Sequence, residues 1–222
     1  ENETVIEEPA NQETLTRRYT ERAEDFIKRN KDDSFFLYLP YTIPHAKYEI
    51  PELEPYVDDS WSDDAKVHAS MVTRMDRDVG KILDALKEHY IDEKTIVFFC
   101  SDNGAAQRWE GVFDSSGPLR GHKRDMYEGG IRTPMIVRWP NRVESGTVSD
   151  AVWYFADVLP TLAALAGTEP SQNIDGVDVL PTILGQRQDL NDRYLYWEFF
   201  ERGFQQAVRW RNWKAVRLQP GA

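Results

Sequence analysis

Three features are scarce in this chain of 222 residues: cysteine, positive charge and long apolar runs. The one cysteine, Cys100, excludes a disulfide within the chain. Lysine and arginine number 27 against 38 aspartate and glutamate residues, and this deficit argues against nucleic acid as the main partner. No apolar run approaches the length of a membrane span, so we expect no transmembrane helix.

The apolar content, by contrast, is sufficient for a folded domain. Hydrophobic residues make up 41% of the chain and aromatic residues 12%, which allows one sizeable core and a small appendage. Helical spacing of apolar residues marks three segments, 11–31, 67–90 and 156–166. Short apolar runs predict three buried strands, 34–39, 95–100 and 135–139. This alternation predicts an α/β fold with a largely parallel sheet.

The pattern changes after residue 185. Short strand-like segments joined by turns follow, at 194–199, 206–210 and 213–218. Such a succession is typical of an antiparallel meander. We therefore expect an α/β domain over residues 1–185 and the start of a small antiparallel subdomain over 186–222.

A polar tetrapeptide, Ser101-Asp102-Asn103-Gly104, directly follows the apolar run 95–100. Ligand sites of open α/β sheets lie at the carboxyl ends of strands, where this segment falls. The Asp102 carboxylate and the Asn103 carbonyl are hard oxygen donors, which suit Ca²⁺ or Mg²⁺. An Asp-Asn-Gly segment after a strand is also typical of a plain turn.

Two further segments carry groups suited to an anion. His45 follows a proline in the long loop 40–61, where it is either a site residue or an ordinary loop histidine. Lys123 is flanked by Arg120 and Arg124. A basic cluster is usually a solvated face, yet three cations together also fit an anion such as sulfate.

Seven segments of the chain, in this order, resemble the motifs of the sulfatase family, arylsulfatase type, within the alkaline-phosphatase superfamily. They are Pro44-His45, Asp76-Arg77-Asp78, Ser101-Asp102-Asn103-Gly104, Leu119-Arg120-Gly121 with Lys123, Tyr127 to Pro134, Asp157-Val158-Leu159-Pro160-Thr161 and Asp175-Gly176. The resemblance covers almost the whole chain. It implies an alkaline-phosphatase-like α/β fold, with a mixed, mostly parallel sheet flanked by helices and an incomplete antiparallel C-terminal sheet.

The resemblance also implies roles for single residues. Asp102 and Asn103 would be two of the oxygen ligands of Ca²⁺, or of Mg²⁺ in its place. Lys123 would contact the sulfate or the nucleophile, and His45 would bind sulfate or lie near the leaving oxygen. A neutral Asn103 would leave the metal ion more electrophilic than a second carboxylate would, which suits the single negative charge of a sulfate ester.

The activity implied by the resemblance is hydrolysis of a sulfate ester, on a small molecule such as an aryl sulfate or on a sulfated oligosaccharide. The family's nucleophile is formylglycine, made from the cysteine of Cys-x-Pro-x-Arg. Cys100 is followed by Ser-Asp-Asn-Gly and does not match. We therefore expect the nucleophile in a missing N-terminal part of the same protein, with this fragment inactive alone. The family further implies a periplasmic or secreted location.

Two rival functions stay open. The first is a phosphate or phosphonate ester hydrolase of the same superfamily, although Asn103 stands where two-metal phosphatases usually have histidine. The second is a non-catalytic binding or structural fragment that never meets a nucleophile.

Some conspicuous side chains receive a structural interpretation. Cys100 is predicted to be a buried, inert hydrophobe, and His68 is predicted to be exposed to solvent. Glu128 is interpreted as a structural partner of Arg132. His122 either lies at the mouth of the pocket or is solvated.

Overall fold

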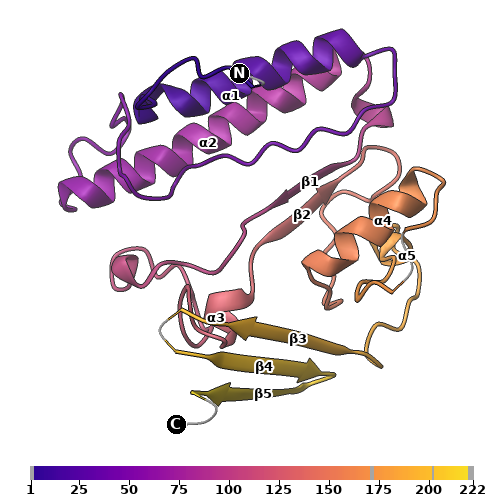
Figure 1. Cartoon of the computed structure of the whole chain (residues 1–222). Coiled ribbons are helices and arrows are strands. Elements are labelled where there is room, and N and C mark those ends of the chain that lie inside the picture. Colours follow the sequence, from indigo (N-terminus) through magenta and orange to yellow (C-terminus); the bar gives the residue numbers. More distant parts are fainter. Residues whose placement is uncertain (1–2, 171–172, 202, 220–222) are drawn as a thin grey trace. The chain divides into compact units, whose positions relative to one another are not determined.

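The computed structural model describes residues 3–170, 173–201 and 203–219 (Figure 1). Backbone contacts divide the chain into two units, Glu1–Thr95 and Ile96–Ala222. Within the described ranges, none of the helices combines the length and the hydrophobicity needed to cross a membrane. The division predicted at residue 185 stays a prediction.

Two long helices dominate the first unit, and both were predicted. Helix α1 spans Gln12–Asn30, and helix α2 spans Asp63–Glu88. The side chain of Asn11 caps α1 by accepting a hydrogen bond from the Glu13 amide at 3.0 Å. Such a cap satisfies an amide that the helix itself leaves without a partner, and so it fixes where the helix begins.

The two helices pack against each other along their apolar sides (Figure 1). Ile27 of α1 and Met71 and Leu86 of α2 are each at most 2% exposed. Burying a side chain of this size contributes about 1.5–3 kcal/mol, so these three residues supply much of the unit's stability. A short 3-10 helix, η1 (Asp92–Lys94), follows α2.

Residues 34–39 do not form the strand predicted for them. The segment nevertheless keeps the alternation of an extended chain, because Phe35 is half-buried against Phe26 while Phe36 and Tyr38 are 69% and 75% exposed. A strand exists only with a hydrogen-bonded partner, and in the described part of this unit no segment pairs with residues 34–39.

A two-stranded ribbon opens the second unit. Strand β1 (Val97–Cys100) pairs with strand β2 (Met135–Arg138), and the pairing places Cys100 opposite Met135. Both strands were predicted, and they pair antiparallel within a fold predicted to have a mixed, mostly parallel sheet. The chain between them contains only η2 (Gln107–Trp109) and the one-turn helix α3 (Glu128–Ile131), rather than a long crossover helix of the kind that usually joins parallel strands.

Short helices and a three-stranded sheet complete the second unit (Figure 1). The helices are α3 (Glu128–Ile131), η3 (Phe155–Asp157), α4 (Val158–Leu165) and α5 (Leu180–Ile183). The strands are β3 (Tyr194–Phe199), β4 (Gln205–Trp210) and β5 (Trp213–Leu218). They pair in sequence order and antiparallel, which confirms the predicted meander.

A buried ion pair fastens the entry of β3 to the start of α4. Asp157 is fully buried and accepts hydrogen bonds from both terminal nitrogens of Arg193, at 2.5 and 2.7 Å. It also accepts from the backbone amides of Tyr154 and Val177, at 3.0 and 2.9 Å. A buried carboxylate is stable only when its oxygens are satisfied in this way, so the contact fixes the path of the chain into the C-terminal sheet.

Candidate functional site

The predicted metal ligands lie in a tight turn at the end of β1. Asp102 is exposed, and Asn103 is half-buried. The Asn103 side-chain amide donates to the Gly104 carbonyl at 3.1 Å, and the Ser101 hydroxyl donates to the Asn103 carbonyl at 3.1 Å. The backbone bends here, and the Asp102 carboxylate remains accessible, so the geometry is compatible with a plain turn and with a ligand role.

Four glycines hold this turn against two other segments of the second unit; we name Gly104, Gly121, Gly129 and Gly130 the glycine block. The Gly104 amide donates to the Gly130 carbonyl at 2.9 Å. A Cβ atom on Gly104 would lie 1.9 Å from the Gly129 oxygen, and one on Gly129 would lie 1.9 Å from the Gly121 oxygen. Any side chain at these two positions would force backbones apart, so the block needs glycine for close approach.

Lys123 is joined to the same turn through its backbone. Its amide donates to the Ala105 carbonyl at 2.8 Å, which places it beside the segment that carries Asp102 and Asn103. The structure thus brings together the backbones of three of the four predicted site residues. His45, the fourth, belongs to the other unit, where it is exposed with its Nδ1 2.8 Å from the Ala46 carbonyl oxygen.

The basic neighbours of Lys123 are engaged elsewhere. The Arg120 guanidinium lies 3.8 Å from the centre of the Tyr127 ring, and the Arg124 Nε lies 2.8 Å from a carboxylate oxygen of Glu201. Both contacts compete with an anion for these two cations. The Lys123 ammonium has no ion pair among the described residues, so it is the charge in this loop best suited to bind an anion.

His122, for which two interpretations were open, is largely buried. Its side chain is 20% exposed, and its Nε2 lies 3.3 Å from a carboxylate oxygen of Glu110. Its backbone amide donates to the Asp125 side chain at 2.9 Å. Simple solvation is therefore excluded, and the residue links the Lys123 loop to the loop after η2.

The donor chemistry fits a hard cation, but only in part. A carboxylate and an amide carbonyl are the kinds of oxygen that Ca²⁺ takes, whereas the ion needs six to eight of them. Within the described ranges, no three histidine, cysteine, aspartate or glutamate side chains cluster closely enough to hold a metal ion. Asp102 and Asn103 could thus supply part of a coordination shell, with the other ligands coming from elsewhere.

Two structural interpretations need correction. Cys100 is exposed rather than buried; partial desolvation of its sulfur raises the pKa of the thiol, and the nearby Asp102 charge raises it further. His68 is half-buried rather than solvated and packs edge-on against Tyr48, with ring centres 5.9 Å apart. Burial lowers the pKa of His68, which keeps its imidazole neutral near pH 7.

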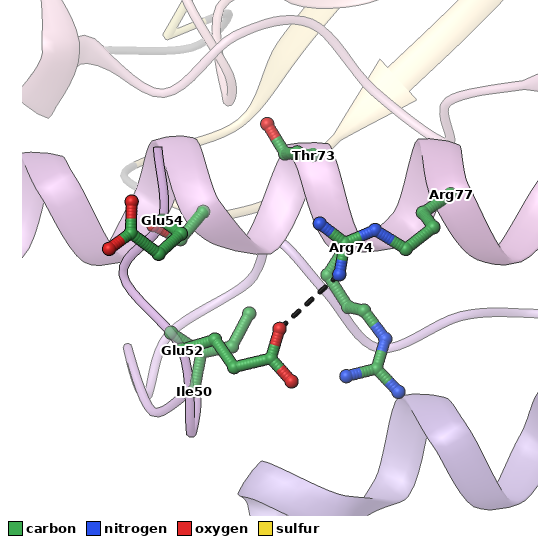
Figure 2. Close-up of a pocket in the computed structure, with 7 residues that line it drawn as sticks. Ile50, Glu52, Glu54, Thr73, Arg74 and Arg77 are labelled. Atoms are coloured by element: carbon green, nitrogen blue, oxygen red, sulfur yellow. Dashed lines mark hydrogen bonds and ion pairs between the residues drawn. The ribbon is translucent and has the colours of Figure 1, made fainter. Parts of the chain in front are cut away.

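The first unit contains a small pocket of balanced charge (Figure 2). It is lined by Ile50, Glu52, Glu54, Ser70, Thr73, Arg74 and Arg77. Arg77 pairs with Glu52 at 3.3 Å across it, and Arg74 pairs with the buried Asp78 at 3.0 Å. Because both arginines already have carboxylate partners, we assign this pocket no ligand.

Comparison with known proteins decides the family. The model of the sulfatase family matches residues 1–168 of this chain. The chain belongs to the sulfatase family. A second model, N-sulphoglucosamine sulphohydrolase, C-terminal, matches residues 121–218, so the C-terminal sheet is shared with relatives as well. The resemblance seen in the motifs is confirmed.

Individual relatives agree with the family match. Mouse steryl-sulfatase (Mus musculus) is 34% identical over 97% of this chain, and dog N-acetylgalactosamine-6-sulfatase (Canis lupus familiaris) is 37% identical over 82%. The chain spans only 35% of the length of either relative. The crystal structure of Ps i-CgsB in complex with k-i-k-neocarrahexaose matches with a TM-score of 0.82 and 32% identity, over 92% of this chain and 46% of that one.

These likenesses confirm the predicted fold class, which is that of the α/β sulfatases. The mostly parallel pairing expected of such a sheet is not found among the described strands, all of which pair antiparallel. A mixed sheet can include an antiparallel pair such as β1–β2.

One contact beside the site could not be predicted from the sequence. Glu128 was interpreted as a partner of Arg132, but its carboxylate pairs with Arg209 of β4 and Lys214 of β5, at 3.0 and 2.7 Å. The partners lie 81 and 86 residues away along the chain, and no local pattern reveals such a pair.

Proposed function

We propose that the protein to which this chain belongs hydrolyses sulfate monoesters and releases inorganic sulfate. The observation that carries the proposal is the glycine block, which holds the Asp102–Asn103 turn and the Lys123 loop together in a member of the sulfatase family. Oxygen donors for a hard cation and an ammonium group then stand on adjoining backbone segments. Such an arrangement suits an anionic ester.

Each group has a distinct task in this proposal. Asp102 and Asn103 hold Ca²⁺, or Mg²⁺ in its place, and the bound ion offsets negative charge on a sulfate oxygen. Lys123 places a positive charge against the sulfate or the nucleophile. His45 binds sulfate or lies near the leaving oxygen, where a proton donor stabilises the departing alkoxide.

The nucleophile is proposed to be a formylglycine outside these 222 residues. Cys100 lacks the Cys-x-Pro-x-Arg context, and its raised pKa disfavours the reactive thiolate. Cys100 is thus unsuited to the task on both counts.

The substrate class is proposed to be a sulfated carbohydrate or an aryl sulfate. The relative of known structure named above was crystallised with k-i-k-neocarrahexaose, and one of the relatives is an N-acetylgalactosamine-6-sulfatase. Sulfated oligosaccharides are therefore the first substrates to test. In keeping with such substrates, we propose a periplasmic or secreted location.

A phosphate or phosphonate ester is the rival substrate. A phosphonate monoester hydrolase shares the fold, with a TM-score of 0.54, but only 18% of its residues are identical. Relatives with sulfatase names reach 34% and 37% identity, and Asn103 gives the proposed metal shell one charge fewer than a second carboxylate would. We therefore prefer the sulfate ester.

The proposal is tested on the full-length protein with 4-nitrophenyl sulfate, 4-nitrophenyl phosphate and a phenyl phosphonate ester. We expect the sulfate ester to be hydrolysed with the highest kcat/KM. A preference for either phosphorus ester would replace the proposed substrate class. If the protein hydrolyses neither these three esters nor sulfated oligosaccharides, the non-catalytic alternative is favoured.

Asp102→Ala should lower Ca²⁺ retention and turnover together, because it removes the proposed charged ligand. Calcium content is measured by atomic emission beside the initial rate. Asp150→Ala, an exposed carboxylate in the same unit but outside the turn, is the matched control and should change neither quantity. Unaltered turnover in Asp102→Ala would exclude the ligand role.

A further inference from the structure

Glu128 joins the segment around the glycine block to the C-terminal sheet. It is the first residue of α3, and one carboxylate oxygen lies 3.0 Å from Arg209 Nη1 while the other lies 2.7 Å from Lys214 Nζ. The three side chains are 27%, 25% and 17% exposed. Because they are partly shielded from water, these charge-assisted bonds hold more firmly than surface pairs do.

A second set of contacts reaches the residue directly after Lys123. The Gln205 side chain donates to the Arg124 carbonyl at 3.3 Å, and the Arg124 side chain pairs with Glu201 at 2.8 Å. Gln205 begins β4, the strand that also carries Arg209. The same sheet therefore holds both ends of the segment from Arg124 to Glu128.

The connection from Glu128 to the proposed site passes through the backbone. Gly129, the next residue, donates to the Arg120 carbonyl at 2.7 Å, and Gly130 accepts from the Gly104 amide at 2.9 Å. The backbones are closely packed at both contacts, because a Cβ atom on Gly129 or Gly130 would overlap neighbouring backbone atoms. A displacement of α3 must therefore shift the Lys123 loop, the Asp102–Asn103 turn or both.

We propose that Glu128 is a positioning residue, and that the C-terminal sheet, through Arg209 and Lys214, fixes the loop that presents Lys123 to the sulfate. This inference rests on the proposed function for the identity of the anion. The contact between Glu128 and the sheet stands on the geometry alone.

The test uses the Glu128→Gln variant of the full-length protein. Substrate is 4-nitrophenyl sulfate, and the inhibition constant Ki of inorganic sulfate reports the anion pocket. We expect kcat/KM to fall at least tenfold and the sulfate Ki to rise at least fivefold. The direction of the change in sulfate Ki discriminates between two mechanisms. Glu128→Gln removes a negative charge, so electrostatics alone would lower the Ki, whereas loss of positioning raises it.

Lys214 supplies a second variant and a rescue. Lys214→Met should raise the sulfate Ki in the same direction, whereas Lys214→Arg keeps the charge and should stay within threefold of wild type. Arg211→Met is the matched control. Arg211 lies at an exposed turn of the same sheet and pairs with Asp192 at 3.0 Å, rather than with a residue of α3 or of the Lys123 loop. We expect this control to lie within twofold of wild type.

Hydrogen–deuterium exchange gives a readout without substrate. The amides of Gly104, Lys123 and Gly129 should exchange at least fivefold faster in Glu128→Gln than in Arg211→Met. An active wild type with unchanged Ki and exchange in both Glu128→Gln and Lys214→Met would overturn the positioning role. A wild type inactive on every sulfate ester would overturn the proposed function instead, and exchange would still decide the role of Glu128. If Glu128→Gln does not fold, amide exchange in Lys214→Met beside Lys214→Arg decides, because loss of the Lys214 charge alone would also raise the sulfate Ki.

Discussion

At the scale of single residues, Asp78 shows how this fold tolerates a fully buried charge. It lies on α2 and accepts from Arg74 Nε at 3.0 Å and from Lys81 Nζ at 2.8 Å. Burial alone would raise the pKa of this carboxyl, but the hydrogen bonds from Lys81 and Arg74 prevail and lower it. A lowered folded-state pKa means that the carboxylate stabilises the protein above about pH 4, and that this contribution is lost as the pH falls through the folded-state pKa.

Asp78→Asn should therefore lower the free energy of unfolding by about 3 kcal/mol near pH 7, because it leaves two cations without their buried partner. The deficit should shrink as the pH falls below about 4, where the carboxyl of the unfolded chain becomes protonated, and it should be lost below the lowered folded-state pKa of Asp78. Urea unfolding at pH 7 and at pH 3 measures both effects.

The matched control is Asp84→Asn on the same helix, where Asp84 is 76% exposed in its pair with Lys87. Exposed ion pairs contribute about 0–1 kcal/mol to stability. We therefore expect Asp84→Asn to lower the free energy of unfolding by less than Asp78→Asn does. Equal effects of the two substitutions would contradict the account of Asp78.

At the scale of elements, the two kinds of glycine in this chain predict opposite responses to alanine. Gly129 has the Gly121 oxygen 1.9 Å from where a Cβ atom would stand, whereas Gly80, inside α2, has nothing within 4 Å. Gly129→Ala should destabilise by about 3 kcal/mol and remove activity, because backbone has to move. Gly80→Ala should stabilise by about 0.5–1 kcal/mol by restricting the unfolded chain and favouring the helix.

Thermal unfolding of the two variants beside wild type tests this contrast. A fall in Tm for Gly80→Ala would contradict the open space found at Gly80. An unchanged Tm together with full activity for Gly129→Ala would show that the close approach in the glycine block is not required.

The long helices and the C-terminal meander could be predicted because their signals are local. An amphipathic stripe and a cap such as Asn11 define α1, and alternating residues between turns define β3 to β5. The strand predicted at 34–39 was wrong because an apolar run favours an extended backbone but does not supply a strand to pair with. The antiparallel pairing of β1 with β2 could not be foreseen for the same reason.

For the candidate site too, local features could be predicted and contacts between distant segments could not. The Asp102–Asn103 turn and Lys123 are visible as motifs. The partners of Glu128 and the burial of His68 depend on contacts between distant segments, which composition and periodicity do not encode.

At the scale of the whole molecule, the chain matches sulfatases over a third to a half of their length. We expect the 222-residue chain alone to release no sulfate from 4-nitrophenyl sulfate and to bind Ca²⁺ weakly, because two oxygen ligands are too few for a tight site. Steady-state assays and calorimetry measure these quantities. Robust turnover, or a dissociation constant below micromolar, would mean that the nucleophile or the metal site has been misplaced.

A crystal structure of the full-length protein with Ca²⁺ and inorganic sulfate bound would show whether Asp102, Asn103 and Lys123 form one anion site. We predict oxygens of Asp102 and Asn103 within about 2.3–2.6 Å of the ion, and the Lys123 ammonium in hydrogen-bond contact with the sulfate or the nucleophile. Calcium and sulfate bound elsewhere, with these three side chains pointing to separate surfaces, would contradict it.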